Sequence, residues 1–174
     1  MRYAAAAMDF LEAMQTYFAG EKVTGVVFAC YGVLLIGAAI GLYRVDSGPF
    51  AWGFLVPLGV VGLGGLVGGA VLAAKTGPQL DALVSLYQTD ADAFVAQELP
   101  RMRKVNANWP RLEMVWTAII ALALAVIWTG WREWATGLAL ALLVGAASAM
   151  VLDVFAERRA RVYTTHLEAL GPAG

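Results

Sequence analysis

Two groups of charged side chains, each beside a long apolar segment, are the residues of this sequence best suited to form a binding or catalytic site. They are Glu98, Arg101, Arg103 and Lys104 before one segment, and Asp153, Glu157 and Arg161 after another. Asp153 and Glu157 are four residues apart and share one helix face, where two unpaired carboxylates at a membrane boundary are unfavourable. We therefore expect Arg101 or Arg103 to supply a basic partner, and Glu157 to pair with Arg161 four residues later.

Three kinds of site fit these charges. The first is a structural network of ion pairs that locks the segment around residue 100 against the last helix, and this is the interpretation we favour. The second is an anion site, in which the arginines bind a phosphate-bearing ligand or lipid headgroup. The third is a carboxylate site for a hard cation, for which two or three carboxylates are a small ligand set.

Few other residues of the sequence could take part in catalysis. The chain has one histidine, His166, and one cysteine, Cys30, and it has no phosphate-binding loop, dinucleotide fingerprint or zinc spacing. No nucleophile can be matched with a base, so we expect no enzymatic activity and no cofactor or metal. The net charge of −1 argues against nucleic acid as a partner.

The elements that position these charges are apolar and long enough to cross a bilayer. Of the 174 residues 60% are hydrophobic and 14% are charged. Four segments have the length of a membrane span, at residues 23–43, 51–74, 112–130 and 134–152. The only charge within them is Glu113. The sequence therefore predicts an all-α, integral membrane four-helix bundle made of two antiparallel hairpins.

Glycines are dense in the first predicted hairpin. A glycine costs roughly 1 kcal/mol against alanine in a soluble helix, whereas in lipid small residues let helix backbones approach closely. Several pairs have the four-residue spacing that places both members on one helix face. We predict helix packing for six of them: Gly37, Gly41, Gly64, Gly65, Gly68 and Gly69.

Basic residues predict the orientation of the spans. With four spans, ten of the twelve Lys and Arg residues lie on the side of both termini, and only Arg44 and Arg132 lie on the other. Basic residues resist translocation, so both termini are expected in the cytoplasm, with the protein in the cell (inner) membrane. Membrane lipid is then one partner, and other membrane subunits or further copies of the chain are the others.

Five regions follow from this topology. Residues 1–22 form an amphipathic cytoplasmic or interfacial helix that ends at Gly20, and 23–74 form the first transmembrane hairpin. Residues 75–111 form a cytoplasmic connection of short helices, with turns at 77–78 and 108–110, a helix capped by Thr89 and a kink or interruption at Pro100. Residues 112–152 form the second hairpin, and 153–174 extend its last helix into the cytoplasm.

Two stretches, ELPRMRKVNANW at 98–109 and VLDVFAERRARVY at 151–163, resemble sequences of small, uncharacterised bacterial four-span membrane proteins. The resemblance implies the four-span architecture and carries over no activity.

The function expected from these features is non-catalytic. We expect a structural or accessory subunit of a homo-oligomer or of a larger membrane complex. The alternative is an oligomeric channel or transporter for a small solute, and a weaker alternative is a protein that binds or modifies lipid.

Overall fold

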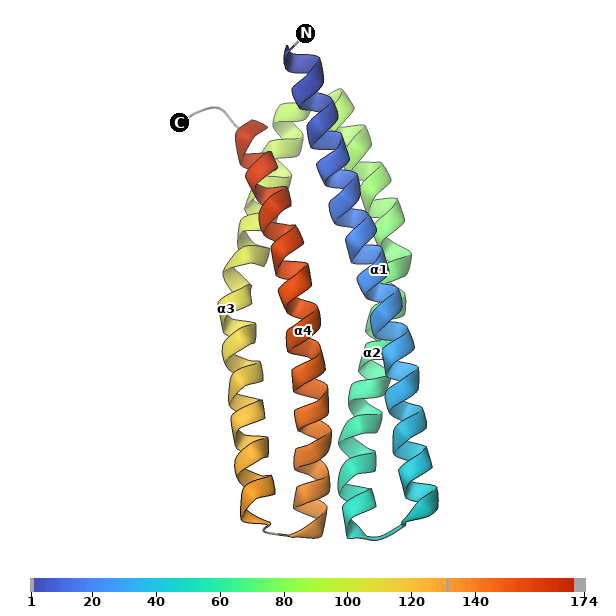
Figure 1. Cartoon of the computed structure of the whole chain (residues 1–174). Helices are drawn as coiled ribbons and strands as arrows, with labels where there is room; N and C mark the ends of the chain where they lie inside the picture. Colours follow the sequence, from blue (N-terminus) through green and yellow to red (C-terminus); the bar gives the residue numbers. More distant parts are fainter. Residues whose placement is uncertain (1, 131, 171–174) are drawn as a thin grey trace.

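A computed structural model describes residues 2–130 and 132–170, with side chains from Asp9 onward. Four helices follow one another: α1 (Arg2–Val45), α2 (Pro49–Thr89), α3 (Ala91–Thr129) and α4 (Glu133–Leu170). They run side by side as an antiparallel bundle (Figure 1). All four are long and apolar enough to cross a membrane. The predicted all-α four-helix membrane bundle is confirmed.

The helices are much longer than the hydrocarbon layer of a bilayer. With 38 to 44 residues each, they measure about 57–66 Å, against about 30 Å of hydrocarbon. The start of α1, the end of α4 and the α2–α3 junction lie at one end of the bundle, and the α1–α2 and α3–α4 connections lie at the other (Figure 1). We call these the terminal end and the hairpin end. The four predicted spans occupy the half toward the hairpin end.

The expected breaks in the helices are wrong in most places. Helix α1 continues through Gly20, α2 continues through Pro78, and α3 continues through Pro100 and Pro110. A proline removes one hydrogen bond from a helix, and a neighbouring helix packed along the same stretch can stabilise the chain by more than this loss.

One break remains between residues 75 and 111, and it falls at Asp90. The Asp90 side chain accepts a hydrogen bond from the Ala93 amide at 2.9 Å and so begins α3. The expected cap, Thr89, instead donates its hydroxyl to the Ser85 carbonyl oxygen at 2.6 Å. Helix α3 ends at Gly130, whose φ of 56° is favourable for glycine.

Glycine allows the closest contacts between helices. A methyl group at Gly25 of α1 would lie 2.7 Å from the Gly69 carbonyl oxygen of α2, closer than van der Waals contact. Gly32 is equally tight against the backbone of α2 near Gly62, and Gly137 of α4 lies against the α2 backbone at Phe50. Helix α2 therefore packs closely on both α1 and α4, which joins the two hairpins.

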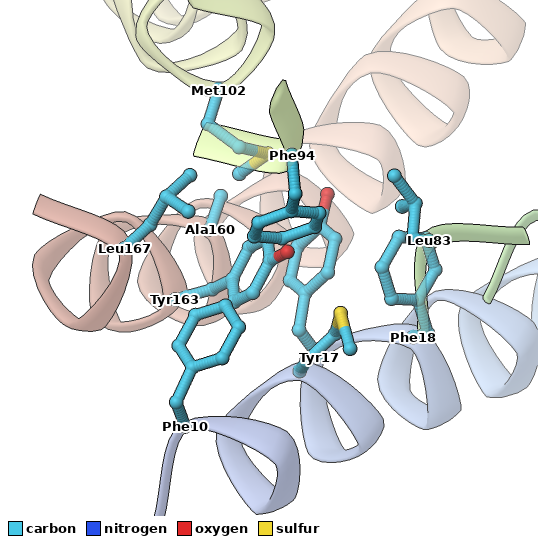
Figure 2. Close-up of a cluster of buried hydrophobic side chains, with 10 residues drawn as sticks. Phe10, Tyr17, Phe18, Leu83, Phe94, Met102, Ala160, Tyr163 and Leu167 are labelled. Atoms are coloured by element: carbon cyan, nitrogen blue, oxygen red, sulfur yellow. The ribbon is translucent and has the colours of Figure 1, made fainter. Parts of the chain in front are cut away.

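Most of the largest buried side chains gather at the terminal end, outside the predicted spans. We call this cluster the aromatic core (Figure 2); its buried members are Phe10, Met14, Tyr17 and Phe18 of α1, Leu83 of α2, Phe94 and Met102 of α3, and Ala160, Tyr163 and Leu167 of α4. All four helices contribute to it. The N-terminal part of α1, from Phe10 to Phe18, therefore docks on the other three helices.

Candidate functional site

Glu98 and Arg101 form an ion pair at the edge of the aromatic core. Glu98 is 1% exposed, and its two carboxylate oxygens accept hydrogen bonds from Arg101 Nε at 2.7 Å and Nη2 at 2.5 Å. The Tyr163 hydroxyl of α4 donates to Glu98 Oε1 at 3.4 Å. A buried carboxylate needs such partners, so this group ties α3 to α4.

Burial and charge set the protonation of the groups around Glu98. Burial, with the nearby Glu21 carboxylate, raises the pKa of Tyr17 to about 12. Burial and Glu98 raise the pKa of Tyr163, and the hydrogen bonds that Arg101 donates to Glu98 raise the pKa of Arg101. Both phenols are therefore neutral and the guanidinium is charged at neutral pH. This arrangement is suited to holding helices together and poorly suited to proton transfer.

The other predicted charges are divided among separate contacts. Arg103 of α3 pairs with Glu168 of α4 at 3.2 Å on the surface. Arg161 pairs with Glu157 within α4, as expected from their spacing, and its Nε donates to Glu157 Oε1 at 2.8 Å. Lys104 is exposed and forms no ion pair with any residue of the described ranges.

The expected pairing of Asp153 with Arg101 or Arg103 is wrong. Asp153 Oδ2 instead accepts a hydrogen bond from the Trp116 indole Nε1 of α3 at 2.7 Å. Antiparallel packing places Trp116 opposite Asp153, whereas Arg101 lies fifteen residues before Trp116 in α3, about 22 Å away along the helix axis.

A second contact across the terminal end explains Gly20, which sequence reasoning assigned to a helix end. The side chain of Arg159 crosses α1 at Gly20, where a methyl group would lie 2.5 Å from Arg159 Nε. Arg159 Nη2 then donates to Thr24 Oγ1 at 2.7 Å. Gly20 therefore makes room for a side chain of α4.

A cavity of about 410 Å³ lies within the half of the bundle that contains the predicted spans, and sequence reasoning missed it. All four helices line it, mostly with glycine, alanine and leucine. Gly64 and Gly68 are exposed and also line the cavity, so it opens beside α2. Asp153 and Trp116 belong to the same lining and are its strongest polar groups. We call this the span cavity.

The six glycines predicted for helix packing fall into two groups. Gly65 and Gly69 lie against the backbone of α1. Gly37, Gly41, Gly64 and Gly68 have no atom of another helix within 4 Å of the position that a Cβ would take. Contact between subunits at these four positions stays a prediction.

Among residues 9–130 and 132–170, no three His, Cys, Asp or Glu side chains converge as a metal site would require. The chain is a multi-pass, four-helix membrane protein by its fold and its four apolar helices. No protein-family model, no curated protein and no solved structure matches it. The resemblance to small bacterial four-span proteins therefore stays a hypothesis.

Proposed function

We propose that this protein is a structural or accessory membrane subunit that assembles as a homo-oligomer or within a larger membrane complex. The observation that carries the proposal is the pair Gly37 and Gly41, which is exposed on α1 and touches no other helix of the chain. At 100° per residue the two glycines share a face with three other exposed residues. We call this the α1 outer face: Val23, Cys30, Leu34, Gly37 and Gly41.

This proposal is supported by other glycines of α1, which allow close packing against a neighbouring helix. Where Gly25 and Gly32 face α2, the two backbones come into direct contact. Gly37 and Gly41 offer the same absence of side chains on the opposite side of α1, toward the lipid. In a bilayer, helices associate through such close packing because the surrounding lipid is as apolar as the helix surface. A second copy of α1 fits this face.

Crosslinking through Cys30 tests the homo-oligomer. Cys30 is the only cysteine in the chain, and it is exposed seven residues before Gly37, about 10 Å along the same face. In proteoliposomes, a bismaleimide reagent that spans about 10 Å should join two chains through Cys30. Gly37→Leu/Gly41→Leu should abolish the crosslinked dimer.

A matched control keeps this test specific. Ala121 and Ala125 are exposed on α3 with the same four-residue spacing, so Ala121→Leu/Ala125→Leu adds equal bulk to another helix and should leave the dimer intact. A dimer that survives Gly37→Leu/Gly41→Leu would place the contact elsewhere. If wild-type protein forms no crosslinked dimer and light scattering gives the mass of a monomer, the homo-oligomer is contradicted.

We further propose that the terminal end lies in the cytoplasm and the chain in the cell (inner) membrane. The support is the ten-to-two distribution of Lys and Arg between the two ends. In a Cys30→Ala background, a single cysteine at exposed Lys104 should react with a membrane-impermeant maleimide only after cells are opened. A cysteine at exposed Ser47 should react in intact cells.

A channel or transporter is the second candidate, because the span cavity gives a small solute a place within the bundle. Flux of ions or small solutes into proteoliposomes, lost when Gly64→Leu fills the cavity, would support it.

A further inference from the structure

The span cavity has two chemically different parts. Most of its wall is apolar and is made of small residues, among them Gly64, Gly65 and Gly68 of α2 and Gly145 and Ala146 of α4. The other part is the Asp153 carboxylate beside the Trp116 indole, one residue past the predicted end of the fourth span. This shape suits an amphiphile, with its body among the small residues and its head at Asp153.

Asp153 is the only charged residue that lines the cavity. Its side chain is half-buried and accepts one hydrogen bond, from a neutral donor. It forms no ion pair with any residue from Asp9 to Leu170 that the structure describes. Other carboxylates of the terminal end, such as Glu98 and Glu157, have arginine partners. A carboxylate at the wall of an apolar cavity without a cation attracts a positive charge strongly, because little water screens it.

The charge complementarity selects the chemical class of the ligand. A small hydrated metal ion prefers several oxygen ligands, and this cavity offers one carboxylate. A cation carried on an apolar body loses little hydration on entering, contacts the apolar wall, and can lie over an indole ring as well as beside a carboxylate. An anion would be repelled, and a neutral molecule would gain nothing from Asp153.

We propose that the span cavity binds a lipophilic cation, an apolar molecule with one positive charge, with the charge at Asp153 and Trp116. The ligand enters beside α2, where Gly64 and Gly68 are exposed and leave the cavity open. This inference is independent of the α1 outer face, which lies on another helix.

Binding of radiolabelled tetraphenylphosphonium tests the proposal. The full chain in phosphatidylcholine nanodiscs should bind this cation saturably, and empty nanodiscs should not. Asp153→Asn keeps the shape of the side chain and an oxygen that accepts from Trp116, yet it should weaken binding at least tenfold. Glu157→Gln should leave binding unchanged. This control removes a carboxylate one turn further along α4 that already pairs with Arg161.

Two further measurements keep the proposal falsifiable if Asp153→Asn does not fold. Gly64→Leu places a side chain at a position where no atom lies within 4 Å, so it should fold, fill the cavity and abolish binding. Neutral triphenylphosphine oxide has a similar apolar body and should compete poorly.

Three outcomes would overturn the proposal. The first is the lack of saturable binding by the wild-type protein. The second is equal binding by the Asp153→Asn or Gly64→Leu variant. The third is equal competition by the neutral compound, which would make the cavity an apolar crevice filled by lipid chains.

Discussion

The rings of Tyr17 and Tyr163 stack across α1 and α4, with their centroids 4.8 Å apart and their planes 10° from parallel. The contact joins residues near the two ends of the chain and lies at the centre of the aromatic core (Figure 2). Phe10 and Phe18 add further ring contacts to Tyr163. Tyr163 of α4 therefore contacts three aromatic rings of α1.

Tyr163→Ala should lower the free energy of unfolding by about 3–5 kcal/mol, because it removes a large buried ring and leaves a cavity. Tyr163→Phe keeps the ring and loses only the 3.4 Å hydrogen bond to Glu98, so it should cost about 1 kcal/mol. Thermal unfolding in detergent, followed by circular dichroism, measures both. Val162→Ala changes the exposed neighbour and is the control. Equal losses for Tyr163→Phe and Tyr163→Ala would contradict the stacking argument.

Alkaline pH should weaken the fold through Tyr17. Burial in the folded protein raises the pKa of Tyr17 from its ordinary value of 10.0 to about 12. A group whose pKa is raised by folding contributes stability below its unfolded pKa and loses it as pH rises through the folded value. The melting temperature should therefore fall less steeply between pH 10 and 12 in Tyr17→Phe than in the wild type. Tyr43→Phe removes a phenol outside the aromatic core and is the control; parallel curves for wild type and Tyr17→Phe would refute the assignment.

Breaking the Glu98–Arg101 pair should be asymmetric. The Arg101 side chain is 37% exposed and can reach water, whereas Glu98 is 1% exposed. Arg101→Leu leaves a buried carboxylate without its main partner and should cost about 3–5 kcal/mol. Glu98→Leu should cost less, and the double variant Glu98→Leu/Arg101→Leu should recover much of the loss.

The surface pair formed by Arg103 and Glu168 is the matched control for this asymmetry, and Arg103→Leu should cost about 1 kcal/mol or less. Chemical denaturation of all four variants in one detergent gives the comparison. A larger loss for Glu98→Leu than for Arg101→Leu would be incompatible with the burial of Glu98.

Two glycines of α1 should respond differently to the same small change. Gly32→Ala places a methyl group against the backbone of α2, which cannot yield as a side chain can, so the α1–α2 contact must open and the melting temperature must fall. Gly37→Ala meets no atom within 4 Å and should leave the thermal stability of the monomer unchanged or slightly higher. Similar losses for both variants would show that the close approach at Gly32 is unimportant.

Hydropathy and charge in the sequence predicted the four helices and their antiparallel order, because apolar length is a strong constraint in a bilayer. The helix end predicted at Gly20 and the turns predicted at Pro78 and Pro110 were wrong because they rest on local propensity, and packing along the whole bundle outweighs it. Gly20 proved to accommodate Arg159, a contact between residues far apart in the chain that no local rule predicts.

The candidate site was less predictable than the fold. The spacing of Glu157 and Arg161 was sufficient to predict their pair, since both lie on one helix. The partners of Glu98 and Asp153 depend on how α3 is aligned with α4, and sequence composition carries no information on that register. The span cavity depends on the relative placement of all four helices, so it became visible only in three dimensions.

The position of the aromatic core gives the two halves of the bundle different sensitivities to their surroundings. Most of the largest buried side chains lie at the terminal end, beyond the predicted spans, while the closest backbone contacts within the spans are made by glycine. Lengthening the acyl chains of the host lipid acts only on the contacts within the predicted spans. Bilayer thickness should therefore alter the separation of the hairpins and the volume of the span cavity, while the four helices stay packed together through the aromatic core at the terminal end.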